Sequence, residues 1–587
     1  MVKQLMNSIR EFKLATILTP TFVVGEVIIE ALIPFLISLL INDIKAGCDL
    51  SVILGYAWKL VVLSLLSLLC GYLAGIYCAE ASTGFARNLR YDIFTNIQKF
   101  SFSNIDKFSS ASLVTRLTTD IQNVQMAFMM IIRTAVRAPL NLIFSFTMAY
   151  IMGGSMAVIF LIIIPFLGIG LYLIVRTVMP VFKKGFPLFD KITRIVEENV
   201  KGIRVVKSFV REDYEINKFD ETSNDIRKMF TRAEQIIALN NPLMQISIYA
   251  VMLFVLMFGS EMIIKTNGTS LDVGQLSTLM TYGFQIMVSL MMLSMVFVMI
   301  TFSEESCKRI IEVLNEKSSI TSKENAITEV KDGSIDFDHV RFKYSPTAER
   351  PVLENIDVHI KSGETIGIIG GTGSAKSSFV QLIPRLYDVT EGTVRVGKED
   401  VRDYDLVTLR DSVAMVLQKN VLFSGTIADN IRWGNKDATL EEVKHVCHLA
   451  CADEFIEQMP DGYDTWIEQG GTNVSGGQKQ RLCIARALLK QPTILIMDDS
   501  TSAVDTTTDA IIRKAMKEYI PETTKIIIAQ RTSSVEDVDR IIVLDGGKID
   551  AIGTSEELLQ TNQIYREVYL SQNKQGTEEI VEEGGVR

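Results

Sequence analysis

The chain has 587 residues, a net charge of −10 at pH 7 and a mean hydropathy of +0.24. This length predicts several domains, and this hydropathy is high for a soluble enzyme. The negative charge argues against a surface that binds nucleic acid. The seven cysteines are scattered along the sequence, so they indicate no disulfide framework.

Long apolar stretches account for the high hydropathy. A transmembrane helix needs about 20 apolar residues, and this length is reached at residues 15–42, 52–79, 129–152, 154–178, 242–264 and 273–302. We therefore expect a six-span transmembrane domain over residues 15–312. Residues 1–14 are expected to form a short amphipathic helix on the membrane surface.

Basic residues predict the orientation of these spans. The long segments after the second and fourth spans carry most of the Lys and Arg of this half, for example Arg87, Lys107 and Lys184. The opposite loops hold few, chiefly Lys45 and Lys265. The positive-inside rule then places the long segments and both termini in the cytoplasm.

Two carboxylates lie within the first predicted span. Glu26 and Glu30 are four residues apart and therefore share one helix face. Carboxylates at membrane depth usually line a cavity or a polar path, where they could attract cationic substrates or carry protons. The alternative is that one or both lie near a water-filled outer opening.

A methionine stripe follows one side of the sixth predicted span. Met287, Met291 and Met295 repeat every four residues. The flexible thioether suits pockets that accept varied apolar ligands, so these residues are a candidate substrate path. The alternative is ordinary packing against lipid or neighbouring helices.

A glycine-rich loop in the second half predicts a phosphate site. An apolar run at residues 364–369 precedes it and a helical pattern begins at Phe379, which gives the strand, loop and helix that a P-loop requires. Its backbone N–H groups and the helix dipole would cradle phosphates. The loop residues are Gly370, Gly371, Thr372, Gly373, Ser374, Ala375, Lys376, Ser377 and Ser378.

The loop and a later carboxylate predict a nucleoside triphosphate and Mg²⁺, and the family resemblance described below implies that the nucleotide is ATP. Lys376 would reach the β- and γ-phosphates, and the Ser377 hydroxyl would hold Mg²⁺. Asp498 follows four apolar residues and is the strand-end carboxylate expected to coordinate or orient the metal. Ala375 departs from the pattern G-x-x-x-x-G-K-[ST], where a second glycine is usual. If this position has a positive φ, the extra Cβ costs roughly 1–2 kcal/mol.

A group of histidines and cysteines in the second half is a candidate metal site. His445, Cys447, His448 and Cys451 fall within one segment of helical periodicity. Structural zinc needs four ligands in tetrahedral geometry, and these side chains do not share one helix face. We therefore expect no metal centre at this segment.

Two further motifs identify a family resemblance. The run Val474–Gln478, followed by the apolar strand pattern that ends at Asp498, resembles the signature motif and Walker B strand of ATP-binding cassette (ABC) ATPases. Six spans followed by one such ATPase resemble a half-transporter of the type IV exporter class, which includes multidrug and lipid pumps. The resemblance implies a helical membrane domain with long cytoplasmic extensions and an α/β P-loop ATPase domain with a helical subdomain.

The same resemblance sets the remaining domain boundaries and assigns roles. It implies a linker at residues 313–334, a nucleotide-binding domain at 335–571 and an acidic disordered tail at 572–587. Short coupling helices are expected at 102–108 and 211–219. Tyr344 matches the residue that stacks on adenine, Gln418 matches the glutamine that contacts Mg²⁺ and the attacking water, and Ser502 and Asp505 match the D-loop that crosses to the partner ATPase.

Two residues depart from the family pattern on the γ-phosphate side. Asp499 stands where the family has a catalytic glutamate, and Gln530 stands where it has a histidine. The Asp499 side chain is one methylene shorter, and a misplacement of about 1 Å can reduce a rate roughly 10²-fold. Gln530 can donate a hydrogen bond but carries no charge. This site is therefore expected to bind ATP better than it cleaves it.

The signature motif, in contrast, keeps Ser475, Gly476, Gly477 and Gln478 unchanged. Family ATPases pair head to tail, so this chain is expected to supply its signature to a competent site on a second half-transporter. The implied function is a heterodimeric exporter of small amphipathic compounds or lipids in a cytoplasmic (inner) membrane, with its ATPase domain in the cytoplasm. The alternatives are an ATP-gated channel or regulatory membrane protein, and a slow homodimeric lipid flippase.

Overall fold

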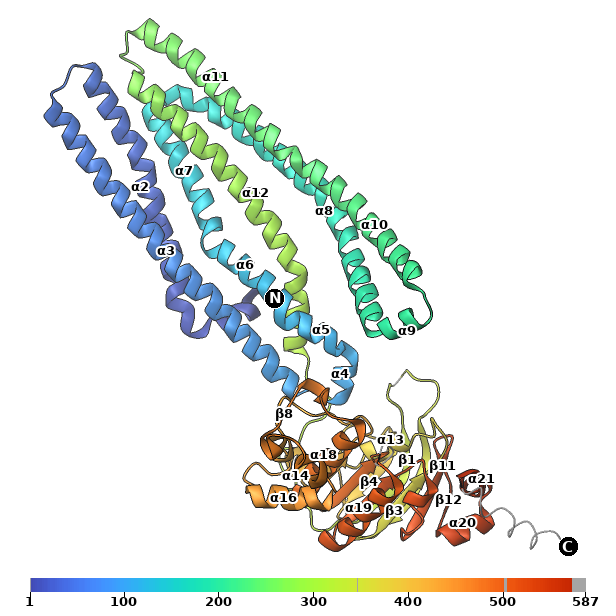
Figure 1. The fold of residues 1–587 in the computed structure, drawn as a ribbon. Coiled ribbons are helices and arrows are strands. Elements are labelled where there is room, and N and C mark those ends of the chain that lie inside the picture. Colours follow the sequence, from blue (N-terminus) through green and yellow to red (C-terminus); the bar gives the residue numbers. More distant parts are fainter. Residues whose placement is uncertain (1, 346, 501–503, 573–587) are drawn as a thin grey trace. The chain divides into compact units, whose positions relative to one another are not determined.

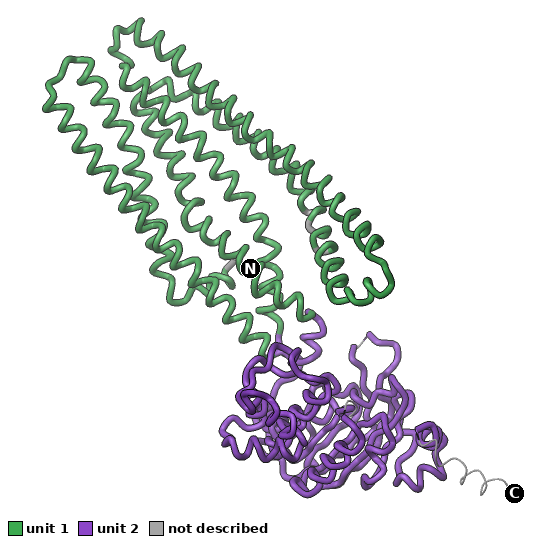
Figure 2. Tube along the Cα trace, viewed as in Figure 1, with its two compact units in different colours: residues 1–99, 109–316 green, residues 100–108, 317–587 purple. Residues whose placement is uncertain are grey.

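The computed structural model describes residues 2–345, 347–500 and 504–572. They form two compact units (Figure 2). The first unit comprises residues 1–99 and 109–316, and the second comprises residues 100–108 and 317–587. The predicted acidic tail lies outside the described residues except for Gln572, and the predicted D-loop residue Ser502 also lies outside them.

The described part of the first unit is helical (Figure 1). The residues of the predicted spans lie largely in these helices, several of which exceed the roughly 20 residues that a bilayer requires, and the bounds of the spans stay a prediction. The elements are α1 (Val2–Met6), the 3₁₀ helix η1 (Asn7–Phe12), α2 (Lys13–Lys45), α3 (Leu50–Gln98), α5 (Ser110–Thr115), the π-helical turn η2 (Arg116–Asp120), α6 (Ile121–Ile132), α7 (Thr134–Gly153), the 3₁₀ helix η3 (Gly154–Ala157), α8 (Val158–Lys201), α9 (Ile203–Ser208), α10 (Glu212–Ala238), α11 (Asn240–Thr266) and α12 (Val273–Asn315).

Within the described residues, five helical stretches are long and apolar enough to cross a membrane. The stretch Ser110–Lys201 includes two predicted spans, 129–152 and 154–178, so the number six stays a prediction. The first of these two spans is interrupted at Arg133, between α6 and α7. Gly154, the first residue of the second of these spans, has a φ of 50°, a left-handed value that glycine adopts readily.

Two expected helices differ from the structure. The prediction of a short helix at 211–219 is wrong, because the short helix is α9 and residues from Glu212 onward begin the 27-residue helix α10. The turn between them includes Val210, which has a φ of 51°. The N-terminal segment forms α1 and η1 instead of one helix, since Arg10 has a non-helical backbone.

An ion-paired group connects α2 with α7 in the first unit. Arg137 Nη1 lies 3.2 Å from Glu26 Oε1, and Arg137 Nη2 donates to Glu30 Oε1 at 2.7 Å. The three side chains are between 10% and 29% exposed. One guanidinium thus partners both carboxylates that the sequence placed on one face of the first span.

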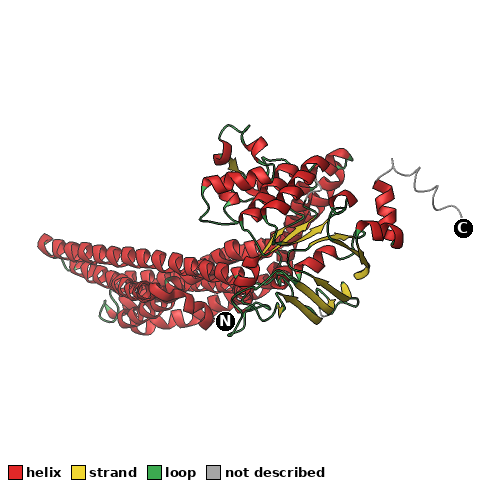
Figure 3. Ribbon diagram, turned by 90° about the horizontal axis from the view of Figure 1, so that it is seen from below, coloured by secondary structure: helices red, strands yellow, loops and turns green. Residues whose placement is uncertain are grey.

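The second unit contains all of the described strands (Figure 3). Its main sheet has the order β12-β11-β3-β10-β9-β6, in which β12 pairs antiparallel and the other neighbours pair in parallel. Every residue of β9 and β10 is buried, as expected for central parallel strands. The six strands are β3 (Thr365–Ile369), β6 (Val413–Val416), β9 (Ile494–Asp498), β10 (Thr524–Ile528), β11 (Arg540–Asp545) and β12 (Lys548–Gly553).

Two smaller sheets and a set of short helices complete this unit. The antiparallel sheet has the order β2-β1-β4-β5, and β7 pairs with β8. These strands are β1 (Ile335–Phe342), β2 (Leu353–Ile360), β4 (Glu391–Val396), β5 (Glu399–Asp400), β7 (Gly425–Thr426) and β8 (Trp466–Ile467). The helices are α4 (Phe102–Phe108), α13 (Lys376–Gln381), α14 (Leu406–Ser412), α15 (Ile427–Ile431), α16 (Leu440–Leu449), α17 (Asp453–Ile456), α18 (Gly476–Leu489), α19 (Thr506–Tyr519), α20 (Ser555–Thr561) and α21 (Gln563–Gln572), with 3₁₀ turns η4 (Gly462–Asp464), η5 (Gln469–Gly471) and η6 (Thr532–Ser534).

The expected short helix at 102–108 forms as α4, and it belongs to the second unit. The buried Asn104 side chain accepts from Ser319 N at 3.2 Å and donates to Lys317 O at 3.2 Å. Tyr387 Oη donates to Asp106 Oδ2 at 3.0 Å. Hydrogen bonds therefore hold α4 against residues that are more than 200 positions later in the chain.

The ion-paired group in the first unit generates a stability prediction. Replacing both Glu26 and Glu30 by Gln leaves Arg137 charged without its two partners, which is expected to destabilise the protein by at most about 3 kcal/mol because the group is partly exposed. Adding Arg137→Met should recover most of this loss. Thermal unfolding of the purified protein in detergent measures both effects.

Glu261→Gln is the matched control, because Glu261 pairs with Lys265 one turn away on the same helix and both side chains are about half exposed or more. Its expected cost is below about 1 kcal/mol. A double variant no less stable than this control would contradict the proposed dependence of Arg137 on its partners.

Candidate nucleotide site

The predicted phosphate loop lies between β3 and α13. A Cβ added to Gly370 would lie 2.1 Å from Leu544 O, so the loop needs glycine where it passes the end of β11. Lys376 Nζ donates to the carbonyl oxygens of Gly370 at 2.8 Å and Gly371 at 2.9 Å. The ammonium is therefore held directly over the glycine-rich turn.

Ala375 has a φ of 69° and a ψ of 23°, which is the left-handed conformation that the missing glycine would adopt without strain. Ala375 therefore has the positive φ at which a Cβ is unfavourable. The backbone cost of roughly 1–2 kcal/mol applies to the folded loop, and the surrounding sheet has to offset it.

Two consecutive carboxylates end strand β9. Asp498 is 5% exposed and accepts a hydrogen bond from the Ser377 hydroxyl. Asp499 is 8% exposed, has a φ of 50°, and donates its backbone N–H to Ile528 O at 3.0 Å. Hydroxyl and carboxylate oxygens are ligands that Mg²⁺ prefers, so Ser377 and Asp498 fit the metal that the loop implies.

The three residues predicted on the γ-phosphate side lie together. Gln530 Nε2 donates to Asp499 Oδ2 at 2.8 Å, and Gln418 Nε2 donates to the same oxygen at 3.4 Å. These residues come from the end of β10, the end of β9 and the segment after β6, which are neighbouring strands of the parallel sheet. The carboxyl ends of parallel strands meet at one edge, where ligands of such sheets bind.

Burial dominates the electrostatics of this cluster. It raises the pKa of Asp498 and of Asp499, although hydrogen bonds from Ser377 and from the two glutamines oppose these shifts. Burial also lowers the pKa of Lys376, and the two nearby carboxylates oppose this change. A ligand of opposite charge would therefore stabilise the ionised form of each of these three groups.

Tyr344 lies beside the same loop. Its hydroxyl is 2.8 Å from Ser378 Oγ, and its ring contacts Tyr387 edge to face with centroids 5.0 Å apart. The side chain is 46% exposed. A partly exposed aromatic ring next to the phosphate loop is suited to stack on a nucleobase.

The signature residues form the start of a separate helix. Ser475 is the N-cap of α18, with Gln478 N donating to its hydroxyl and Gln478 Oε1 accepting from Ser475 N. Gly476 is exposed and Gly477 is half-buried. Among the described residues, no hydrogen bond or ion pair joins this motif to the phosphate loop.

The D-loop residue Asp505 is the N-cap of α19. Its side chain accepts from Thr508 N at 2.9 Å and from the Thr508 hydroxyl at 2.7 Å. The histidine and cysteine group at residues 445–451 forms no cluster of metal ligands in the part of the chain that the structure describes.

The predicted substrate path is only partly accessible in the first unit. Met287 is fully buried in the helical core, whereas Met291 is 44% and Met295 is 60% exposed. The successive 40° offset of residues four apart on a helix accounts for this change along the stripe. Glu26 and Glu30 both pair with Arg137, a partner that sequence reasoning missed because it lies over 100 residues away.

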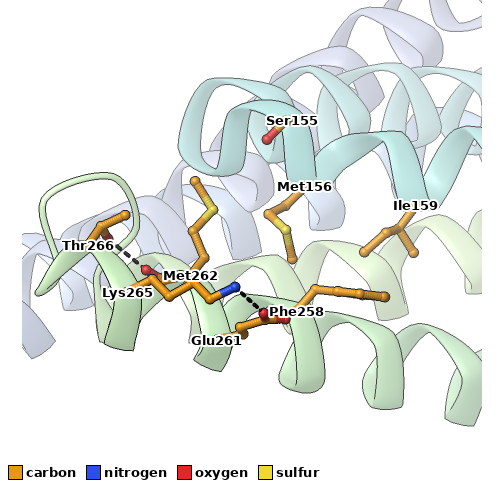
Figure 4. Close-up of a pocket in the computed structure, with 8 residues that line it drawn as sticks. All are labelled: Ser155, Met156, Ile159, Phe258, Glu261, Met262, Lys265 and Thr266. Atoms are coloured by element: carbon orange, nitrogen blue, oxygen red, sulfur yellow. Dashed lines mark hydrogen bonds and ion pairs between the residues drawn. The ribbon is translucent and has the colours of Figure 1, made fainter.

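A pocket of about 360 Å³ lies elsewhere in the first unit (Figure 4). Met156, Ile159, Phe258 and Met262 provide its apolar walls, and the ion pair between Glu261 and Lys265 lies at its side. None of the predicted path residues lines it.

The left-handed conformation of Ala375 generates a prediction. Ala375→Gly removes the Cβ strain but adds chain entropy to the unfolded state, so a net gain of about 0.5–1 kcal/mol in the free energy of unfolding is expected. The thermal midpoint of the second unit should rise by about 2 °C. Ala510→Gly, in the exposed middle of α19, is the matched control and should lower it. Equal losses from both variants would contradict a strained Ala375.

Comparisons with known proteins agree with this architecture. Residues 16–303 match the family model of the ABC transporter transmembrane region, and residues 353–502 match the ABC transporter family model. An uncharacterized ABC transporter ATP-binding protein of Bacillus subtilis, YfiB, is 33% identical over 98% of this chain and 100% of its own length. An ATP-dependent lipid A-core flippase of Photobacterium profundum is 30% identical over 86% of this chain and 88% of its own length.

A solved structure of a bacterial Atm1-family ABC exporter with ATP bound has the same fold. The two structures align with a TM-score of 0.82 at 24% sequence identity, over 96% of this chain and 98% of the other. The apolar helices of the first unit, the nucleotide site of the second and the full-length relatives lead to one conclusion: the chain belongs to the ABC transporter family, as a multi-pass membrane protein of the exporter type whose ATPase domain drives transport.

Proposed function

We propose that this chain is one subunit of a heterodimeric ATP-driven exporter. It binds ATP and Mg²⁺ at a site of its own that hydrolyses slowly, and it supplies Ser475, Gly476, Gly477 and Gln478 to the competent site of a second half-transporter. The observation that carries the proposal is the hydrogen-bonded group of Gln418, Asp499 and Gln530.

The position of Asp499 supports a catalytic defect. A general base must lie within hydrogen-bond reach of the water it polarises, and this carboxylate is one methylene shorter than the family's glutamate. Its backbone is fixed by the bond to Ile528, and two amides donate to one of its oxygens. The side chain therefore has little freedom to extend toward a water at the γ-phosphate.

The chemistry of Gln530 supports the same defect. Charge that develops on the transferred phosphoryl group is stabilised by positioned donors and cations. A glutamine amide donates one hydrogen bond at most to such a group while its other N–H stays with Asp499, and it carries no positive charge. A second N–H donor and a positive charge at residue 530 matter less for the binding of ATP than for its cleavage.

The signature supports the presence of a competent site on the partner. Ser475 begins a 14-residue helix whose first turn has exposed backbone, and such an N-terminus favours a phosphate. The motif has kept the residues that serve another chain's nucleotide. The residues that serve this chain's own γ-phosphate are the ones that have changed.

Amphipathic compounds or lipids are the proposed substrates, exported from a bacterial cytoplasmic (inner) membrane. The resemblance to lipid A-core flippases supports a lipidic substrate. Met291 and Met295 are proposed to contact it, because their exposed thioethers suit apolar ligands. Met287 is not proposed as a contact, since it is buried, and Glu26 and Glu30 are proposed as structural partners of Arg137.

A slow homodimeric lipid flippase is the second candidate. The flippase relatives and the presence of both a nucleotide site and a signature motif in one chain favour it. Both composite sites would then carry Asp499 and Gln530. The two candidates differ in whether full activity requires a second, different chain.

Catalytic asymmetry is the first expected outcome. In the complex with its co-purified partner, Asp499→Ala should lower steady-state ATP hydrolysis by less than about threefold, because this site contributes little turnover. Ser475→Arg should lower it by more than about 20-fold, because the bulky cation blocks the partner's composite site. The chain purified alone should hydrolyse ATP slowly.

Two results would contradict this assignment. Similar large losses from Asp499→Ala and Ser475→Arg would make this chain's own site the competent one. Vigorous, cooperative hydrolysis by the chain alone would support the homodimer. Asp498→Ala serves as the control that removes Mg²⁺ coordination from this site without touching the signature.

Hydrolysis-dependent transport is the second expected outcome. The reconstituted complex should move a short-chain fluorescent lipid or an amphipathic dye against its gradient with ATP, and should show less than about a tenth of that rate with AMP-PNP, because resetting the transporter needs hydrolysis. Downhill conductance on AMP-PNP binding alone would support the ATP-gated channel instead.

A further inference from the structure

The loop that carries Gln530 has a second attachment besides the contact with Asp499. Gln572, the last residue of α21, donates from Nε2 to Gln530 O at 2.8 Å. Its Oε1 accepts from Thr532 N at 2.9 Å and from the Thr532 hydroxyl at 3.2 Å. One side-chain amide therefore binds the backbone on both sides of Arg531.

The geometry of this contact depends on an amide. The carbonyl of Gln530 requires a donor, and the backbone N–H of Thr532 requires an acceptor, so the partner must present both within one planar group. Thr532 is only 1% exposed. A polar backbone group in such a place costs about 1–3 kcal/mol when it loses its partner, so the exposed Gln572 provides a hydrogen bond that the Thr532 N–H needs.

The helix that carries Gln572 is itself anchored to the core. Tyr565 is fully buried beside residues of β3, β10 and β11, and its hydroxyl lies 2.8 Å from Ser555 Oγ. Asn562 Oδ1 accepts from Tyr565 N at 2.8 Å, which fixes the start of α21. The amide of Gln572 is thus presented from a helix with a defined position relative to the sheet.

We propose that Gln572 is a positioning residue that fixes the loop of residues 530–532, so that the side chain of Gln530 is held at Asp499 and ready to contact the γ-phosphate. Hydrogen bonds hold the loop at three points. Gln530 donates to Asp499, Arg531 donates to Val504 O at 3.2 Å, and the backbone carbonyl of Gln530 accepts from Gln572. Without the Gln572 contact, part of the ordering cost of the loop falls on nucleotide binding.

The role of Gln572 does not depend on whether the nucleotide site is degenerate or on whether the complex is a heterodimer. It concerns recognition of the third phosphate by this chain's own loop. Loss of the Gln572 contact should therefore change the preference of the site for a triphosphate over a diphosphate. General disruption of the fold would instead weaken the binding of both nucleotides alike.

The test compares the affinities of the full-length chain for AMP-PNP and for ADP, measured with Mg²⁺ in detergent. Gln572→Ala should weaken AMP-PNP binding about fivefold to tenfold and change ADP binding less than about twofold. Gln572→Glu keeps the acceptor for Thr532 and loses the donor for Gln530, so it should have an intermediate effect. Gln563→Ala should change neither affinity, since Gln563 bonds Glu567 on the same helix.

A double-mutant cycle completes the experiment. If Gln572 acts through Gln530, Gln572→Ala should have little further effect on AMP-PNP binding in the Gln530→Ala background. Parallel losses of AMP-PNP and ADP binding, unchanged binding of both, or an undiminished effect in the Gln530→Ala background would each overturn the proposal. Failure of the heterodimer assignment would appear in the hydrolysis assays and not in this binding ratio.

Discussion

The buried carboxylate of Asp499 is the point on which the nucleotide site depends. Asp499 follows β9 directly and has a left-handed backbone, and its N–H donates to Ile528 O at the end of β10. Its Oδ2 accepts from the side-chain amides of Gln418 and Gln530. Burial alone raises the pKa of this group, and the two amides counter that effect by stabilising the charged form. The short side chain of Asp499 and the neutral amide of Gln530 are thus joined by a hydrogen bond within this chain.

The ionisable groups of the nucleotide site carry unequal numbers of positive and negative charges. Asp498 and Asp499 contribute two negative charges and Lys376 one positive charge, so the ionised cluster carries −1 before any ligand binds. All three groups are penalised by burial. A magnesium ion beside Ser377 and Asp498 would offset the excess, and a triphosphate would give Lys376 a stronger partner than the two loop carbonyls it now contacts. The charges of Mg²⁺ and of a triphosphate would therefore be met mainly by Asp498 and Lys376, without a contribution from the neutral Gln530.

The sequence predicted those features that depend on local pattern. The strand, loop and helix around Lys376 formed as expected, the coarse fold of a helical membrane domain and an ATPase domain is confirmed, and the cost at Ala375 could be anticipated because φ at this position follows from the loop itself. The boundaries of α9 and α10 were missed, since the charged residues around Glu212 suit both a short and a long helix.

What the sequence could not reveal were contacts between distant segments. Arg137 is 107 positions from Glu30, and Gln572 is 42 positions from Gln530. Nothing in the local pattern of either residue distinguishes it from an ordinary polar side chain. The same limit applies to the γ-phosphate group: the sequence indicated that Asp499 and Gln530 both belong there, but not that they bind each other.

The placement of α4 shows how chain connectivity and noncovalent contacts differ. Residues 100–108 interrupt the sequence of the first unit, yet Asn104 and Asp106 are bonded to the second. Tyr387, which donates to Asp106, also contacts the Tyr344 ring beside the phosphate loop. A displacement of the ATPase domain must therefore carry α4 with it, unless these hydrogen bonds break first. The backbone at residues 99–100 and 108–109 joins α4 covalently to α3 and α5, so α4 belongs to the second unit by its contacts and to the chain of membrane helices by its sequence.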